Sequence, residues 1–190
     1  MFINEARLNV EKDGKVTELK RDNIDRLASI CKLHGPHAQV GVNVGTTIGY
    51  GEMKIDVSVT LTCDQTEVAM DEAARIALDV GHDFMNQGLI HHGLAPVKFN
   101  AASLWDKALW DKAPAKESPP DRVALLCSGR GALAHVGVNV GTTIGYGEVK
   151  LKSNVRLACD QNEARLSEAA GLAIEKSNEY TRWGLAGYDR

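Results

Sequence analysis

One thirteen-residue stretch occurs twice in this chain. The segment from Val40 to Glu52, VGVNVGTTIGYGE, returns letter for letter from Val136 to Glu148, ninety-six positions later. Self-similarity at a fixed offset constrains a fold strongly, because equivalent segments adopt equivalent supersecondary structures. The chain is therefore predicted to contain two tandem copies of one unit.

The match extends on both sides of the identical stretch and divides the chain into four parts. Residues 1–19 are expected to form an N-terminal hairpin or cap, 20–89 the first repeat, 90–115 a connector with a short tryptophan-containing helix, and 116–190 the second repeat. All thirteen central pairs agree, but only thirteen of the next thirty-seven do. Two causes remain open for this uneven identity. The stretch is either a tight glycine-rich hairpin packed against its twin, or a pair of equivalent binding loops.

Each unit is predicted to be helix–strand–strand–helix. Helices are expected over residues 23–33 and from residue 118, and the six residues from Thr46 to Gly51 are expected to be the hairpin connection. Residues 53–63 alternate between apolar and polar, which indicates an antiparallel strand buried on one side only. A long helix should follow, capped by Asp64 in the first repeat and Asp160 in the second. The predicted fold is α+β, a pseudo-two-fold unit whose antiparallel sheet is covered on one face by helices, with both repeats sharing one core.

Composition limits the classes of function. The net charge of −3 argues against a strongly electrostatic nucleic-acid binder, although it leaves room for a local basic patch. No apolar run approaches a membrane span and no signal-peptide pattern is present, so a cytoplasmic protein without membrane contact is expected. The four cysteines form two repeat-equivalent pairs, Cys31 with Cys127 and Cys63 with Cys159. Reduced, buried thiols are favoured over disulfides within each unit.

No catalytic or metal-binding signature stands out. None of the six histidines has a histidine at the equivalent position of the other repeat, so no symmetric metal site is expected. Nucleophile elbows, the His-Glu-x-x-His pattern and the P-loop lysine pattern are absent from the sequence. The chain is therefore predicted to be a non-enzymatic protein that needs no cofactor.

The order of motifs resembles a group of viral proteins. Gly45 to Glu52 reads Gly-Thr-Thr-Ile-Gly-Tyr-Gly-Glu, an alternating strand from Lys54 follows, and Cys63-Asp64 precedes the long helix. This order is similar to short phage-encoded proteins of unassigned function, in which a Gly-x-Tyr-Glu hairpin leads into a strand and one long helix. The chain departs from them in having two units, a helix before each hairpin, and Gly51 between the tyrosine and the glutamate. The resemblance implies a viral accessory protein in a host cytoplasm and supplies no active-site residues.

Three classes of function remain open, and each has its own candidate residues. A nucleic-acid-binding protein would use cations on the open sheet face, namely Lys54, Lys150, Lys152 and Arg156. A binder of a nucleotide-like ligand, or of nucleic-acid bases, would use the paired Gly-Thr-Thr loops, with Thr46, Thr47, Tyr50, Thr142, Thr143 and Tyr146. A protein-docking inhibitor or self-assembling structural protein would use these loops together with Trp105 and Trp110. Nucleic acid is the leading partner, a protein is the alternative, and a homo-oligomer is expected.

Overall fold

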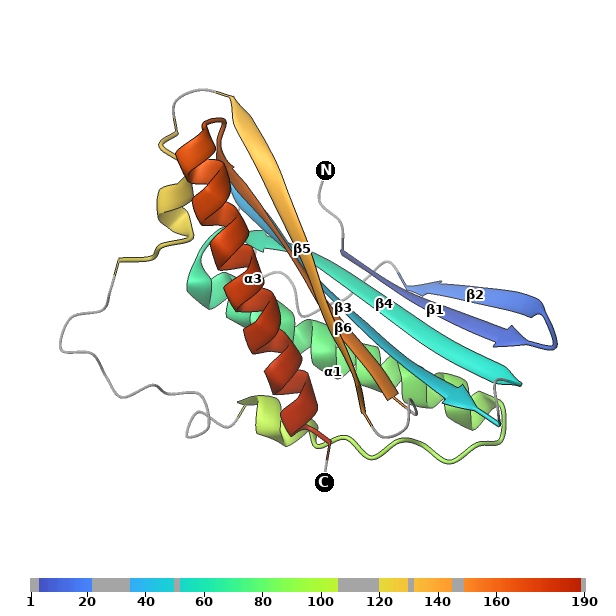
Figure 1. The fold of residues 1–190 in the computed structure, drawn as a ribbon. Helices are drawn as coiled ribbons and strands as arrows, with labels where there is room; N and C mark the ends of the chain where they lie inside the picture. Colours follow the sequence, from blue (N-terminus) through green and yellow to red (C-terminus); the bar gives the residue numbers. More distant parts are fainter. Residues whose placement is uncertain are drawn as a thin grey trace.

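A computed structural model of the chain describes residues 4–21, 35–49, 52–105, 120–129, 132–144 and 149–188. These residues form a sheet, two long α-helices and two short 3-10 helices (Figure 1). In chain order the elements are β1 (Asn4–Lys12), β2 (Lys15–Arg21), β3 (His37–Ile48), β4 (Met53–Asp64), α1 (Glu67–His91), η2 (Ala101–Trp105), η3 (Ala124–Leu126), β5 (Leu133–Ile144), β6 (Val149–Asp160) and α3 (Glu163–Ala186).

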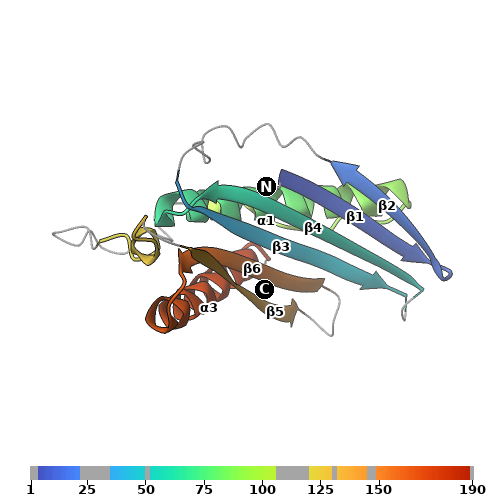
Figure 2. The same ribbon diagram turned by 90° about the horizontal axis from the view of Figure 1, so that it is seen from above.

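The strands form one antiparallel sheet in the order β2-β1-β4-β3-β6-β5. Helix α1 packs mainly on β4 and β3, and helix α3 packs on β6 and β5. Figure 2 shows the strands side by side, with both helices on the same face of the sheet. The predicted α+β class, with an antiparallel sheet covered on one face by helices, is confirmed.

The alternation in the sequence determines which side of each strand is buried. Every second residue of β4 points toward the helices and is at most 5% exposed: Met53, Ile55, Val57, Val59, Leu61 and Cys63. Burying one such side chain contributes about 1.5–3 kcal/mol, so this strand alone anchors much of the core. The core cluster includes side chains of β1, β3, β4, β6, α1 and α3.

The N-terminal segment forms the hairpin that its turn signal suggests. Asp13 and Gly14 both have positive φ, at 52° and 72°, and connect β1 to β2. Two consecutive residues of positive φ match the twist of a tight hairpin, and glycine adopts this conformation without strain. Strand β1 then pairs with β4 along its whole length, so the hairpin extends the sheet.

The expected pseudo-two-fold relation between the repeats is not found. The two hairpins meet through β3 and β6, giving the local order β4-β3-β6-β5 with all neighbours antiparallel. Equivalent strands therefore follow one another in the same order and run in the same direction. The second hairpin is thus a copy displaced along the sheet, whereas a two-fold rotation would have paired β3 with β5 or β4 with β6.

Both helix caps lie two residues beyond the predicted positions. Helix α1 is capped by Thr66, whose hydroxyl accepts a hydrogen bond from Ala69 N at 3.2 Å. Helix α3 is capped by Asn162, whose side chain accepts from Arg165 N at 3.0 Å. The prediction of Asp64 and Asp160 was wrong because strands β4 and β6 run through these residues. The chain then needs two more residues to turn into the helix.

Other boundaries also differ from the predictions. The six residues from Thr46 to Gly51 are not a loop throughout, because β3 continues to Ile48 and the turn begins at Gly49, with φ of 54°. The helix expected from residue 118 is represented in the described part only by the short η3. The helix expected over residues 23–33 lies outside the described residues. In the described part of the connector, the expected tryptophan-containing helix corresponds to the short 3-10 helix η2.

Candidate functional site

The face of the sheet opposite the helices is open and polar. It displays the alternate residues of all six strands, including Asn43 of β3, Ser58 of β4 and Lys152 of β6. The register places these three side chains in one row across the sheet. Within the described parts of the six strands this face carries no Phe, Tyr or Trp, and its rings are the imidazoles of His37 and His135.

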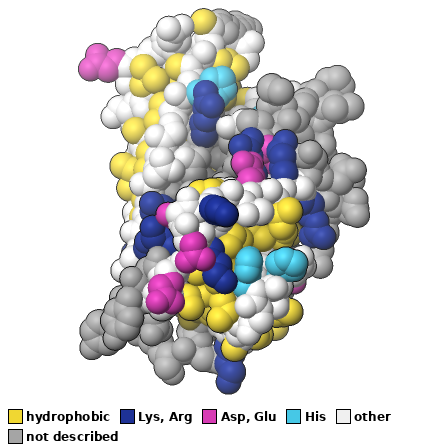
Figure 3. Space-filling view, turned by 90° about the vertical axis from the view of Figure 1, so that its right-hand side faces the viewer, with side chains coloured by type: hydrophobic (Ala, Val, Ile, Leu, Met, Phe, Trp, Pro, Cys, Tyr) yellow, Lys and Arg dark blue, Asp and Glu magenta, His cyan; other side chains and the backbone are white. Residues whose placement is uncertain are grey.

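Charges on the β1–β2 half of this face are paired. Glu5 contacts Arg7 Nη2 at 3.0 Å and Lys20 Nζ at 3.3 Å. The hydrogen bond from Arg7 lowers the pKa of the Glu5 carboxyl and outweighs the opposing effect of burial. Lys54 Nζ lies 3.3 Å from Glu11 of the neighbouring strand. The end of the molecule at the right of Figure 1 shows the same mixing, with acidic and basic side chains interspersed (Figure 3).

Strand β6 carries cations without such compensation. Lys150, Lys152 and Arg156 alternate with buried residues, point to the open face and are exposed. None of the three has an ion-pair partner among the residues that the structure describes. From Lys150 to Arg156 the strand rises by about 20 Å, at roughly 3.3 Å per residue. This basic strip, defined as Lys150, Lys152 and Arg156, is the strongest local charge feature of the open face.

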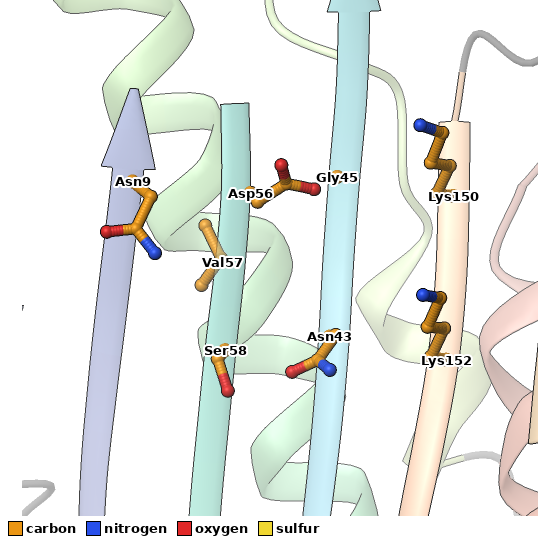
Figure 4. A pocket seen from close by; sticks show the side chains of 8 residues that line it. All are labelled: Asn9, Asn43, Gly45, Asp56, Val57, Ser58, Lys150 and Lys152. Atoms are coloured by element: carbon orange, nitrogen blue, oxygen red, sulfur yellow. The ribbon is translucent and has the colours of Figure 1, made fainter. Parts of the chain in front are cut away.

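A depression of about 430 Å³ lies beside the basic strip. Lys150 and Lys152 form one wall, and mostly polar residues of β1, β3 and β4 form the rest (Figure 4). The remaining lining residues are Asn9, Asn43, Gly45, Asp56, Val57 and Ser58. The two ammonium groups lie along β6, and the Asp56 carboxylate points toward Gly45 (Figure 4). The depression therefore combines a cationic wall with amide, hydroxyl and carboxylate groups that donate and accept hydrogen bonds.

Glycine at two positions leaves room for neighbouring side chains. A Cβ at Gly45 would stand 2.3 Å from Asp56 Oδ1, and a Cβ at Gly141 would stand 2.7 Å from Lys152 Cγ. Gly45 thus lets the Asp56 carboxylate lie over β3, and Gly141 lets the aliphatic part of Lys152 lie over β5.

Two other glycines on the same face have no such steric cause among the described residues. A Cβ at Gly41 would meet only ordinary contacts, the nearest being Asn154 Cβ at 3.4 Å. At Gly137 the nearest atoms, in Arg156, would be 3.9 Å away. Glycine inside a strand often marks a site where another molecule approaches the backbone closely. Packing thus explains part of the repeated Gly-x-x-x-Gly pattern and leaves exposed backbone at Gly137, beside the basic strip.

The structure separates the predicted loop residues. Thr46 and Thr142 point toward the helices, and Thr46 is only 7% exposed. Thr47 and Thr143 lie on the open face, at the ends of β3 and β5. The prediction that these threonines sit in loops was wrong, because each strand includes them. Tyr50, Tyr146 and Trp110 lie outside the described residues, as does the side chain of Trp105.

The sequence analysis did not predict that the lining residues of the depression lie together. The period of two placed Asp56 and Ser58 on the outward face of one strand. Lys150 and Lys152 belong to a distant strand, and Asn9 belongs to a segment outside the repeat. Only the pairing of β6 with β3 and of β1 with β4 brings these groups together.

The cysteines and acidic groups provide no metal or disulfide chemistry in the described part of the chain. Cys63, Cys127 and Cys159 are free thiols there, and Cys63 and Cys159 are buried. Burial raises the pKa of Cys127 and of Cys159, and the nearby Asp160 carboxylate adds to both shifts. No group of three or more His, Cys, Asp or Glu residues that could hold a metal ion occurs among the described residues.

The molecule was also compared with known proteins. None of its described helices has the length and apolar character needed to cross a membrane. No protein-family model, curated protein or solved structure matches the chain.

Proposed function

We propose that this protein binds single-stranded nucleic acid along strand β6, on the open face of the sheet. The observation that carries the proposal is the basic strip, in which three exposed cations alternate along one strand without acidic partners in the described structure. Phosphate groups bind such cations and release counterions, which supplies most of the affinity of a nonspecific complex. The cations of the β1–β2 half contribute less, because Glu5, Glu11 and Glu18 already neutralise them.

The polar groups beside the strip fit the bases of a single strand better than the outside of a duplex. Asn43 and Ser58 can donate and accept hydrogen bonds, and Asp56 can accept from an exocyclic amine. The exposed backbone at Gly137 allows a flat ring to approach the sheet closely. We expect modest sequence preference, because the affinity comes from phosphate contacts. The tandem repeat contributes two versions of one hairpin, of which only the second carries the full set of cations.

The test is a charge reversal on the strip. Lys152→Glu combined with Arg156→Glu replaces two attractive contacts by two repulsive ones, so micromolar binding of a labelled oligonucleotide should fall by at least about tenfold. Fluorescence anisotropy with single-stranded and duplex oligonucleotides measures this loss.

The matched control reverses two cations away from the open face. Lys15→Glu combined with Arg182→Glu changes the net charge by the same amount and should leave binding within about twofold of the wild type. Equal loss in both double variants would show that overall charge, and not the strip, determines affinity. Absence of binding by the wild type at low salt would reject the proposal.

A second candidate is a mononucleotide in the depression. Its volume of about 430 Å³ lies within the range of small-ligand sites, and its lysines and Asp56 could contact phosphate and base respectively. Saturable binding of a mononucleotide, lost in Asp56→Asn and Lys150→Glu but unaffected by Arg156→Glu, would favour this ligand over a polymer. No described contact favours docking of a partner protein through the tryptophan segment.

A further inference from the structure

The outer edge of β5 is open along twelve residues. No described residue pairs with this edge, although the opposite edge of β5 is bonded to β6 throughout. The strand contains no Lys, Arg, Asp, Glu or Pro. Natural sheets usually protect a long edge strand with such residues, with a bulge or with a covering element. An uncharged edge of this length is therefore suited to pairing with another strand.

The protein itself shows how the same sequence pairs when a partner strand is present. Residues 40–48 of β3 are identical to residues 136–144 of β5, and the equivalent edge of β3 pairs with β6 in antiparallel register. Val40, Val42 and Val44 are at most 1% exposed in β3. Their counterparts Val136, Val138 and Val140 are only partly buried. The valines are identical in the two strands, but β3 has a neighbouring strand on both edges and β5 has a described neighbour only on one, which accounts for the difference.

Helix α3 adds an apolar flank on the same side. One flank of α3 faces α1, where Lys176 Nζ and Tyr180 OH contact Asp71 at 3.0 and 2.9 Å. The other flank lies over β5, since the Ser177 hydroxyl donates to Val138 O at 3.4 Å.

A stripe of apolar residues follows that second flank toward the start of the helix. Ala170 lies two turns before Ser177 and shares its face, with Leu166 and Ile174 one turn to either side of Ala170. Leu166 and Ile174 are 36% and 47% exposed. Leu133 at the start of β5, on the opposite face of the sheet, is 46% exposed. Exposed apolar side chains therefore gather beside the open edge.

We propose that a second copy of this chain pairs with this edge, β5 to β5 in antiparallel orientation about a two-fold axis. Such pairing would complete the burial of the partly buried valines of both copies and bring the two α3 flanks together. It places no like charges of Lys, Arg, Asp or Glu from the two strands against each other, because β5 contains none of these residues. A two-fold contact closes on itself and gives a dimer.

The other edge of the sheet is a poorer partner for β5. Strand β2 is exposed along its whole length, and α1 does not extend over it as α3 extends over β5. Its edge residues include Lys15, Glu18 and Lys20, which discourage pairing. A β5–β2 contact would also leave free edges at both ends and lead to open chains of molecules.

The dimer would have a continuous sheet of twice six strands with both basic strips on the same open face. The proposal does not depend on nucleic-acid binding, because it rests on strand pairing and apolar contacts on the helix side. If both proposals hold, a single nucleic-acid strand could contact two strips.

Sedimentation velocity of the full chain tests the proposal. The wild type should sediment at twice the chain mass of 20.6 kDa at micromolar concentration. Ile174→Glu on the α3 flank and Asn139→Lys on β5 should each raise the dimer dissociation constant by at least about tenfold, since each places like charges near the axis. Circular dichroism checks that both variants fold, which is expected because both positions are at the surface.

Two controls complete the experiment. Val68→Glu introduces the same charge at an apolar residue of α1 that is 78% exposed and distant from β5, and the dimer should persist. Leu19→Glu alters the β2 edge and should also leave it intact. A monomeric wild type, or dissociation caused by Leu19→Glu but not by Asn139→Lys, would overturn the proposal.

Discussion

Buried residues that differ between the two repeats have changed together. Where the first repeat has Val57, Gly81 and Met85, the second has Ser153, Ser177 and Thr181. The Ser153 hydroxyl lies 2.5 Å from Ser177 O and 2.7 Å from Thr181 Oγ1. A buried hydroxyl destabilises a core unless it is hydrogen-bonded, so these polar residues are tolerated as a group. Equivalent buried positions are therefore filled by apolar side chains and glycine in the first unit and by hydrogen-bonded hydroxyl groups in the second.

His82 is the buried group whose protonation is most strongly disfavoured. Its Nδ1 lies 2.9 Å from Tyr188 OH, and its ring stacks on Phe99 with centroids 3.6 Å apart. Burial lowers the pKa of His82 to about 3. In the unfolded chain this imidazole has a pKa of about 6.5, so the unfolded state binds an additional proton between these two values.

We predict that His82 makes the protein less stable as the pH falls below about 6.5. The free energy of unfolding should decrease by about 1.4 kcal/mol per pH unit from this residue alone, or about 2 kcal/mol between pH 7 and pH 5. Chemical denaturation of the wild type and His82→Gln at both pH values measures the difference. His91→Gln, at an exposed position of the same helix, is the control and should follow the wild type. Parallel stability curves for the wild type and His82→Gln would contradict the assignment.

At the scale of elements, the buried Gln65 is one of the side chains that join the two repeats. Gln65, which follows β4 and is 2% exposed, reaches the end of β6. Its Nε2 donates to Ala158 O at 2.7 Å and to Val123 O at 3.1 Å, and its Oε1 accepts from Ala158 N at 2.7 Å. The equivalent Gln161 is exposed. The repeat therefore uses the same glutamine as a connection in one copy and leaves it at the surface in the other.

Gln65→Ala should destabilise the protein far more than Gln161→Ala. Removing the buried amide leaves Ala158 N–H and two carbonyl groups without their partner, at a cost of about 1–3 kcal/mol for each group that water does not reach. We expect a loss of about 2–4 kcal/mol in the free energy of unfolding for Gln65→Ala and less than about 0.5 kcal/mol for Gln161→Ala. Urea denaturation of both variants provides the comparison. Similar losses at the two positions would refute this role of Gln65.

Local patterns predicted the elements but not their neighbours. The period of two identified β4 and the outward position of Lys152, and helical spacing identified α1 and α3. The order β4-β3-β6-β5 could not be derived in this way, because the identical sequences of β3 and β5 are equally able to pair with β6. The caps at Thr66 and Asn162 were missed because strand length, which depends on pairing, decides where a helix can begin.

For the candidate site, the sequence predicted the basic strip but not which cations are free. Lys54 occupies the position of the first repeat that is equivalent to Lys150 in the second. Lys54, however, forms an ion pair with Glu11 of the N-terminal hairpin. Asn9 and Asp56 become neighbours of Lys150 only through the assembled sheet. Ion pairs between strands that are distant in sequence depend on the tertiary structure, so the hydrophobic pattern of one segment cannot predict them.

At the scale of the whole molecule, the uneven distribution of charge matters more than its sum. The net charge is −3, yet one half of the open face is internally neutralised and the other presents the basic strip. A local field of this kind attracts a polyanion at short range even when the total charge is negative. The same half of the sheet ends in the open edge of β5, so the binding face and the proposed dimer contact are adjacent.

The most direct test of nucleic-acid binding is the salt dependence of the affinity of the wild type for a single-stranded oligonucleotide. Three phosphate contacts per chain predict that log K against log salt has a slope of about −2 between about 50 and 200 mM salt, at roughly −0.7 per contact. Lys152→Glu/Arg156→Glu should reduce this slope to near zero. A wild-type slope near zero, or a steep slope that the double variant retains, would show that the basic strip does not contact phosphate.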